Sequence, residues 1–159
     1  MGNYEFLLAN CGDIAEIICL YHSVIGTPGC AWNLNYPDIE SARLDIENES
    51  LYILKENDKI IAAASIGRPD EPEDFLWELQ NPCELARVCV TPLKQKQGVG
   101  AIVLQHSIIK AKEKKFDGII MLVSKSNIAA LALYDNNGFE KCGEMVMYDI
   151  DFYCYQMKF

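Results

Sequence analysis

The chain has 159 residues, of which 50% are hydrophobic and 23% charged, and its formal net charge at pH 7 is −9. This composition is typical of a single globular domain, residues 1–159, and excludes a disordered chain. The acidic balance argues against nucleic acid as a partner, since such binding needs Lys and Arg to neutralise phosphates, but it suits a cationic substrate. No apolar run approaches the roughly 20 residues of a membrane span, and the N-terminus lacks the basic start of a signal peptide. We therefore expect no membrane association and a cytoplasmic location.

The Cys and His residues do not predict a metal site. The seven cysteines are odd in number, and none follows C-x-x-C spacing, so neither a disulfide framework nor a structural zinc site is indicated. His22 and His106 lie far apart on expected helices, without a second ligand nearby. We expect no metal.

The first part of the chain predicts a strand followed by two helices. Residues 3–9 alternate as a strand. Asp13 and Glu16 have the spacing of a capping box at the start of the first helix. Pro37 suits the first turn of a second helix over residues 38–47.

Residues 26–37, between these helices, predict an irregular segment. They contain two prolines, two glycines and the large aromatic residues Trp32 and Tyr36, which is typical of a loop that covers something. Residues 50–55 and 59–66 then predict an antiparallel hairpin, because two apolar runs flank a short polar turn.

The second half of the chain predicts a parallel strand pair. A strand over residues 84–90 precedes a basic, glycine-bearing turn and a helix over about residues 98–115, and residues 117–124 form an almost wholly apolar strand. Such a strand–helix–strand unit is a right-handed crossover, which makes its strands parallel. A short helix to about Asn136 ends at a glycine stop, and strands over residues 145–149 and 152–158 complete the chain.

The turn before the long helix has the properties of an anion site. The first backbone N–H groups of a helix have no intrahelical acceptor and are partly positive, so they can hold a phosphate. Gly98 and Gly100 let a ligand approach the backbone, and Lys94 and Lys96 add positive charge. A P-loop string is absent, and Val103 occupies the third glycine position of a dinucleotide fingerprint. The turn predicts a diphosphate site of another kind.

Two motifs carry a resemblance to a known family. Gln95 to Gly100 reads Q-x-x-G-x-G just after a V-x-V-x-P strand end, and Asn127 to Tyr134 reads N-x-x-A-x-x-L-Y, followed by Gly138-Phe139. In this order and separation they resemble the signatures of the GNAT acetyltransferase superfamily. The expected element order, β-α-α-β-β-β-α-β-α-β-β, is similar to that fold along essentially the whole chain. The resemblance implies an α/β (α+β) fold, with a central mixed, mostly antiparallel sheet, a parallel strand pair splayed for coenzyme A, and helices on both faces.

The resemblance also implies an activity and a cofactor site. It implies transfer of an acetyl group from acetyl-CoA directly to a primary amine, which we expect to belong to a small molecule, with no metal. The pyrophosphate would lie on the turn and the pantetheine along the preceding strand as a false strand. The implied cofactor-binding residues are Val88, Cys89, Val90, Gln95, Lys96, Gln97, Gly98, Val99, Gly100, Ala101, Asn127 and Tyr134.

Tyr134 and Glu84 are the implied catalytic residues. Tyr134 would protonate the departing thiolate, and a backbone N–H near Val90 would stabilise the oxyanion. We predict Glu84 as the base because its even spacing from Val88 and Val90 places the three side chains on one face of a strand. A water chain ending at Glu78 or Asp74 is the alternative. Cys89 fits packing on a buried strand better than an acyl carrier, since no His partners it.

The sequence defines the pocket for the amine acceptor less closely than the site for the acetyl donor. Trp32 and Tyr36 are expected to wall its pocket, with Phe75 and Trp77 as further candidates, and a cationic amine could stack on such rings. Leu122 stands where some protein-acetylating members carry a glutamate, which weakens the case for a protein N-terminus.

Two other functions stay open, namely a same-fold acyltransferase with another acyl donor or acceptor, and a CoA-binding module without catalysis. The strand at residues 152–157 either closes the sheet or pairs with a second subunit in a homodimer.

Overall fold

A computed structural model describes residues 3–69 and 77–159. The predicted element order is confirmed, with two added 3₁₀ turns. The elements are β1 (Tyr4–Leu8), a 3₁₀ turn (Cys11–Asp13), α1 (Ile14–Ser23), α2 (Ile39–Glu47), β2 (Leu51–Glu56), β3 (Lys59–Gly67), β4 (Cys83–Val90), a second 3₁₀ turn (Pro92–Lys94), α3 (Val99–Glu113), β5 (Gly118–Ser124), α4 (Ile128–Asp135), β6 (Glu140–Met147) and β7 (Ile150–Lys158).

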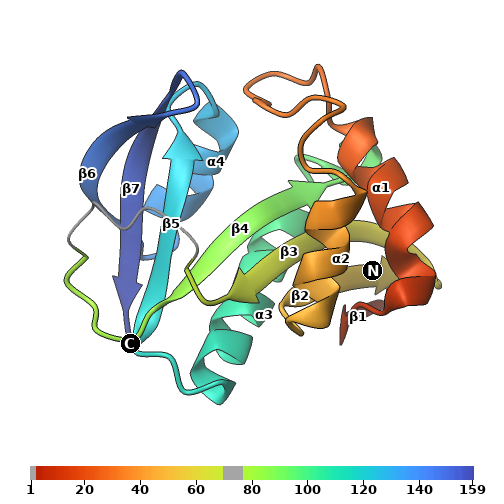
Figure 1. The fold of residues 1–159 in the computed structure, drawn as a ribbon, viewed down its shortest axis with the longest axis horizontal. Coiled ribbons are helices and arrows are strands. Elements are labelled where there is room, and N and C mark those ends of the chain that lie inside the picture. The colour runs from red at the N-terminus through yellow and green to blue at the C-terminus, as the bar shows by residue number, and fades with distance from the viewer. Residues whose placement is uncertain (1–2, 70–76) are drawn as a thin grey trace.

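The strands form one mixed sheet in the order β1-β2-β3-β4-β5-β7-β6 (Figure 1). Among the described strands, only the β4–β5 pair is parallel, and the other neighbours are antiparallel. The parallel pair is short, since its register contains only Cys83 with Ile119 and Glu84 with Ile120. Beyond this point the two strands diverge, and Figure 1 shows the sheet opening into a β1–β4 wing and a β5–β7 wing.

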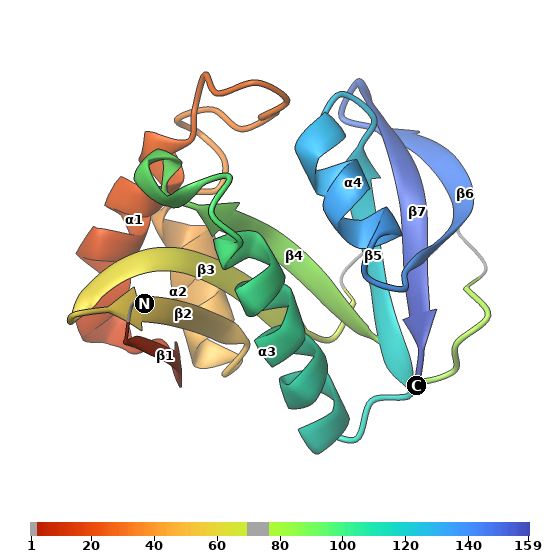
Figure 2. The same ribbon diagram turned by 180° about the vertical axis from the view of Figure 1, so that it is seen from behind.

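Helices cover both faces of the sheet and bury two cores. Helices α1 and α2 lie over one face in Figure 1, and α3 and α4 lie over the other in Figure 2. The core under α3 contains Val103, Leu104 and Ile119, whereas the core under α1 contains Ile17 and Tyr21. Their burial supplies the main driving force for these layers. In the described part of the chain, no helix is both long and apolar enough to cross a bilayer.

Two details of the N-terminal helices differ from the predictions. Asn10, not Asp13, caps the first helical segment: its side chain accepts a hydrogen bond from the amide of Gly12, and Asp13 accepts one from the amide of Asn10. Glu16 instead accepts a hydrogen bond from the amide of Ile60, at 2.7 Å. A local spacing rule missed this partner because it lies 44 residues away. Pro37 precedes the N-cap Asp38 and is therefore outside the first turn of α2.

The final hairpin also differs from its predicted extent. β6 begins at Glu140, five residues earlier than predicted, because this strand has one solvated face and a register shift between Lys141 and Gly143, which together blur its apolar alternation. β7 lies between β5 and β6 and pairs with both. Residues 152–157 therefore close the sheet, which is the first of the two predicted alternatives, and they present no free edge within the described sheet.

Candidate functional site

The turn between β4 and α3 presents unpaired backbone donors. Lys96 and Gly98 have positive φ angles of 61° and 83°, and α3 begins directly after them at Val99. The first hydrogen bond into the helix runs from the amide of Ile102 to the carbonyl of Gly98, at 3.2 Å. The amides of the preceding residues up to Ala101 therefore have no intrahelical acceptor, which is the arrangement that binds phosphates.

The side chains of the turn hydrogen-bond to carbonyl groups of the chain just before it rather than to these amides. Gln95 donates to the carbonyl of Val90 and Gln97 to that of Leu93, both at 3.0 Å. Lys94 forms an ion pair with Glu56 at 2.7 Å, and the hydrogen bond to this carboxylate raises the pKa of Lys94. The charge of Lys94 is thus directed at β2, contrary to the expectation that both lysines serve the turn. Lys96 remains exposed beside the helix start.

The divergence of β4 from β5 leaves one edge of β4 open. After Glu84, β4 pairs with β3 alone among the strands that the structure describes, and β5 pairs with β7. The edge of β4 from Val88 to Val90 therefore faces the gap without a partner strand among the described residues. An extended ligand with amide groups can add there as a short strand.

A β-bulge at Arg87 changes the faces of β4. The β3–β4 register shifts between Ala63 and Ser65, and Arg87 has a φ of 50°. Leu85 before the bulge and Val88 and Val90 after it all pack in the α3-side core. An extra residue inverts the alternation of a strand, so Glu84 lies on the opposite face from Val88 and Val90. The same-face prediction for Glu84 is wrong for this reason, and Glu84 faces α1 and α2 instead.

Tyr134 lies near the end of α4, on the α3 side of the sheet. It is buried, with its ring centroid 5.6 Å from that of Phe139 and 6.2 Å from that of Tyr155. Burial raises the pKa of Tyr134 to about 12, so the phenol is protonated at neutral pH and can donate a proton. Asn127 caps the same helix by accepting a hydrogen bond from the amide of Ala130, at 3.2 Å. Its side-chain NH₂ is not used in this cap.

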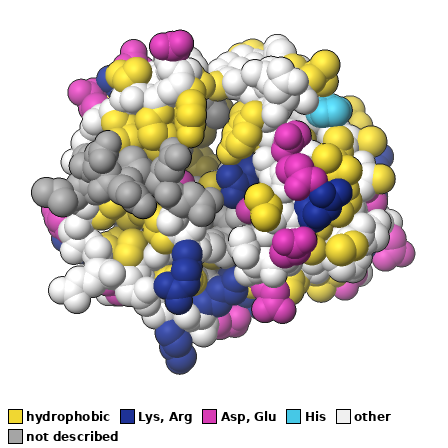
Figure 3. Space-filling view, viewed as in Figure 1, with side chains coloured by type: hydrophobic (Ala, Val, Ile, Leu, Met, Phe, Trp, Pro, Cys, Tyr) yellow, Lys and Arg dark blue, Asp and Glu magenta, His cyan; other side chains and the backbone are white. Residues whose placement is uncertain are grey.

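The loop over residues 24–38 joins the two wings of the sheet. Gly29, with a φ of 80°, packs so closely on the β5–α4 turn that a Cβ there would lie 2.7 Å from Cα of Asn127. Trp32 packs edge-to-face on Tyr21, with centroids 5.5 Å apart. The hydroxyl of Tyr36 accepts a hydrogen bond from Arg87 at 3.0 Å. Both predicted acceptor residues thus lie on the α1 and α2 face of β4, where Asp and Glu side chains gather over α2 (Figure 3).

Sequence reasoning missed a buried ion pair at this face. Nε and Nη2 of Arg87 donate to the two carboxylate oxygens of Asp45 on α2, at 2.7 and 2.8 Å, and only 15% and 9% of these side chains are exposed. The signal that could have found it is an arginine inside the apolar string L-A-R-V-C-V, since such a charge must find a partner.

The structure also describes three other residues that the sequence analysis named. Cys89 is buried, and burial raises the pKa of its thiol strongly, which agrees with the packing role predicted for it. Glu78 pairs with Lys158, and this hydrogen bond lowers the pKa of the Glu78 carboxyl. Trp77 is half-buried. Phe75 and Asp74 lie outside the described residues.

Tyr21 gives a stability prediction. Its hydroxyl is buried without a hydrogen-bond partner among the described residues, and burial is the main reason that its pKa is raised. Because an unsatisfied buried hydroxyl is destabilising, Tyr21→Phe should raise the free energy of unfolding by about 1 kcal/mol. Urea denaturation of both proteins measures this change, and a loss of stability would mean that the hydroxyl is bonded in solution.

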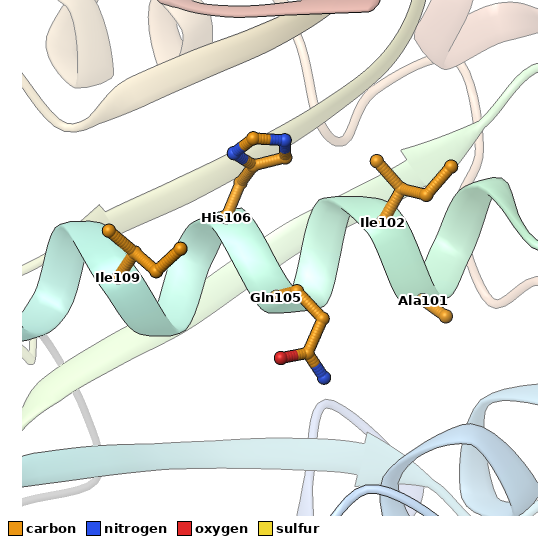
Figure 4. A pocket seen from close by; sticks show the side chains of 5 residues that line it. All are labelled: Ala101, Ile102, Gln105, His106 and Ile109. Carbon is orange, nitrogen blue, oxygen red and sulfur yellow. The ribbon is translucent and has the colours of Figure 1, made fainter.

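An open hollow of about 320 Å³ runs along α3 from Ala101 to Ile109, and its lining is mostly apolar (Figure 4). Within it, His106 stacks on Phe6 with centroids 5.1 Å apart. Across the 3–69 and 77–159 ranges, no three His, Cys, Asp or Glu side chains gather in a metal-holding group.

Comparisons with known proteins agree with this geometry. The family model "Acetyltransferase (GNAT) family" matches residues 14–139. No curated protein sequence matches the chain. The solved structure of ribosomal-protein-S18-alanine N-acetyltransferase from Escherichia coli superposes with a TM-score of 0.76 and 18% identity, over 98% of this chain and 94% of that chain.

Two further solved structures have the same fold. Ribosomal-protein-alanine N-acetyltransferase from Brucella melitensis gives a TM-score of 0.78 and 23% identity, over 98% of this chain and 99% of that chain. A Salmonella typhimurium protein, solved with its cofactor acetyl-CoA, gives 0.78 and 21%, over 98% and 94%. At these identities the likeness is one of fold.

Proposed function

This chain belongs to the acetyltransferase (GNAT) family, and from that premise we propose that it moves the acetyl group of acetyl-CoA directly to a primary amine of a small molecule. The observation that carries the proposal is the opening of the parallel β4–β5 pair after Glu84, beside the unpaired amides at the start of α3. An extended chain would lie in the opening, and the amides would hold its diphosphate.

The donor would lie along β4. Its pyrophosphate would accept hydrogen bonds from the amides between Gly98 and Ala101, with Lys96 nearby as a cation. Its pantetheine amides would bond the open main chain of Val88, Cys89 and Val90. This arrangement leaves the thioester in the gap between the strands, on a path from the turn towards α4.

The reaction needs one base, one oxyanion donor and one acid. The neutral amine attacks the thioester carbonyl, and the backbone N–H near Val90 stabilises the resulting oxyanion. When the C–S bond breaks, Tyr134 gives its proton to the thiolate, and CoA leaves as the free thiol. Glu84, on the face covered by α1 and α2, is our proposed acceptor of the amine proton, with water between them.

The acceptor pocket would lie under the 24–38 loop. Trp32 and Tyr36 supply aromatic surface on which an ammonium group can stack before it loses its proton. The close contact of Gly29 with Asn127 narrows this side of the gap, which supports a compact amine over a folded protein. The Escherichia coli and Brucella melitensis structures carry the names of ribosomal-protein acetyltransferases, so a protein N-terminus is the second acceptor class to test.

Calorimetric titration with acetyl-CoA, with ATP and NAD⁺ as controls, tests the donor. Saturable binding of acetyl-CoA alone is expected. An acceptor panel of spermidine, phenethylamine and an alanine-initiated peptide, followed by release of the CoA thiol, then tests the acceptor. If the protein binds no CoA species, the proposed enzymatic activity is refuted. If it acetylates the peptide faster than either amine, a protein N-terminus replaces the small amine as the proposed acceptor.

Gly98→Val should weaken acetyl-CoA binding by about 10-fold, or roughly 1.4 kcal/mol, since a side chain there crowds the phosphate amides. The titration above measures the effect. Gly26→Val is a matched control, because Gly26 has nearly the same φ, 85° against 83°, and a Cβ at either glycine would meet nothing within 4 Å. Equal affinity losses in both variants would attribute the effect to backbone strain and remove Gly98 from the site.

A further inference from the structure

Arg87 is a buried charge on the acceptor side of β4, next to the strand segment proposed to hold the donor. Arg87 comes directly before Val88 in the sequence. The β-bulge at residue 87 adds one residue to the face of β4 that α1 and α2 cover, and the Arg87 side chain lies on that face. Its guanidinium therefore meets α2 and the 24–38 loop.

The contacts of Arg87 occupy most of its hydrogen-bonding capacity. Asp45 holds two of its nitrogens in a fork, and Nη2 also approaches Ser65 Oγ on β3, at 3.4 Å. Nη1 donates to the hydroxyl of Tyr36 at 3.0 Å. A planar fork with paired carboxylate bonds is a rigid connection. It joins α2, β3, β4 and the loop at a single side chain.

The backbone at this position is also constrained. A φ of 50° is uncommon for a residue other than glycine, and it persists only where surrounding contacts impose it. Burial alone would lower the pKa of Arg87, but hydrogen bonding and the charge of Asp45 outweigh that effect and raise it. The guanidinium of Arg87 therefore stays charged at any working pH.

Around Tyr36, the 24–38 loop has few other contacts with described residues of the sheet or helices. Its own backbone bonds join Asn33 and Tyr36 in a small turn, with N–O distances of 3.1 and 3.2 Å. Tyr36 is 48% exposed and Leu34 is 70% exposed, so burial contributes little to holding this part of the loop. Within the part of the chain that the structure describes, the hydrogen bond from Arg87 to the Tyr36 hydroxyl ties the tip of the loop to the sheet.

We propose that Arg87 is a positioning residue, which fixes the 24–38 loop through Tyr36 and thereby sets the geometry of the acceptor pocket. This inference rests on the proposed function for the identity of that pocket, but the connection itself is a property of the fold. Arg87 touches neither the donor nor the acceptor. Its loss should therefore change amine recognition and leave donor binding intact.

Arg87→Asn is the sharpest variant, because Asn tolerates a positive φ while removing the guanidinium. Hydrogen exchange read by mass spectrometry should show the amides of residues 30–36 exchanging about 10-fold faster, with α3 and β5 unchanged. In the same protein, KM for the best amine of the panel should rise about 10-fold, while the calorimetric Kd for acetyl-CoA stays within twofold.

Two further variants keep the test decisive if Arg87→Asn fails to fold. Tyr36→Phe leaves the Arg87–Asp45 pair intact and removes only the loop contact, so it should reproduce the local increase in exchange at full stability. Arg43→Asn is the matched control, since Arg43 is an exposed arginine of α2 that pairs only within its helix with Glu40. It should leave the loop unchanged.

The outcomes separate the inference from the proposed function. Unchanged loop exchange in Tyr36→Phe, or an equal increase in Arg43→Asn, would overturn the positioning role, whatever the protein catalyses. Failure of the unmodified protein to bind acetyl-CoA would instead overturn the proposed function, and the exchange experiment would still decide whether Arg87 holds the loop.

Discussion

Replacing Tyr134 with Phe should lower kcat for acetyl transfer by about 10²–10⁴-fold, the usual range for loss of a positioned general acid. The Kd for acetyl-CoA should stay within about twofold, because the ring that packs on Phe139 and Tyr155 is retained. Steady-state kinetics with the best amine of the panel, together with calorimetry, measures both quantities. An unchanged kcat would remove Tyr134 from the chemistry.

The environment of Tyr134 explains why a phenol can act as the acid. The side chain is buried at 6% exposure. Its hydroxyl makes no hydrogen bond to any described residue, so no protein acceptor competes for its proton. Burial disfavours the phenolate and raises the pKa from 10.0 to about 12. Because this folded-state pKa is raised, the phenol stabilises the fold fully below pH 10, and this contribution is lost as the pH rises towards 12. Activity should therefore show no loss from Tyr134 ionisation up to about pH 11.

Tyr155→Phe is the matched control for this experiment. Tyr155 belongs to the same ring cluster, but its hydroxyl donates to Asp135 at 2.9 Å. Removing it deletes an equivalent atom from the same wall of the core, so some stability is lost while kcat should change less than threefold. A comparable fall in kcat for both variants would point to loosened packing rather than to a lost proton donor.

The residues whose positions could be predicted from sequence are those placed by local chain geometry. Gly98 and the amides after it follow from a strand, a turn and a helix start that are contiguous in the chain. The short helix that ends near Asn136, and with it the position of Tyr134, is local in the same sense. The parallel β4–β5 pair followed from the crossover rule, which needs only the element order.

The features that sequence reasoning missed or misplaced depend on partners far away in the sequence, or on a strand whose alternation is interrupted. Glu84 was assigned to the wrong face because alternation is a reliable guide only until a bulge, and no residue in the string C-E-L-A-R-V-C-V marks one. Lys94 pairs with Glu56, 38 residues earlier, and Arg87 pairs with Asp45, 42 residues earlier. Such pairs depend on how the helices dock on the sheet, which residue spacing along one segment does not encode.

The largest change in stability is predicted for the buried Arg87–Asp45 pair. Asp45→Asn keeps the shape of the side chain but leaves the Arg87 charge buried without a counter-ion, and breaking such a pair costs about 3–5 kcal/mol. For a chain of this size the melting temperature should fall by about 10 °C. Urea denaturation followed by circular dichroism gives the free energy of unfolding, and the slope of the transition shows whether the native state has also loosened.

Two further variants test whether the uncompensated charge of Arg87 causes this loss of stability. Glu40→Gln removes a carboxylate from the same helix, where the pair with Arg43 is exposed, and it should change stability by less than about 0.5 kcal/mol. Combining Asp45→Asn with Arg87→Met removes both charges, so the double variant should be more stable than Asp45→Asn alone, despite carrying one more substitution. If the double variant is instead the least stable of the series, the pair acts mainly through its hydrogen-bonded fork, and the cost of Asp45→Asn arises from lost geometry rather than from an uncompensated charge.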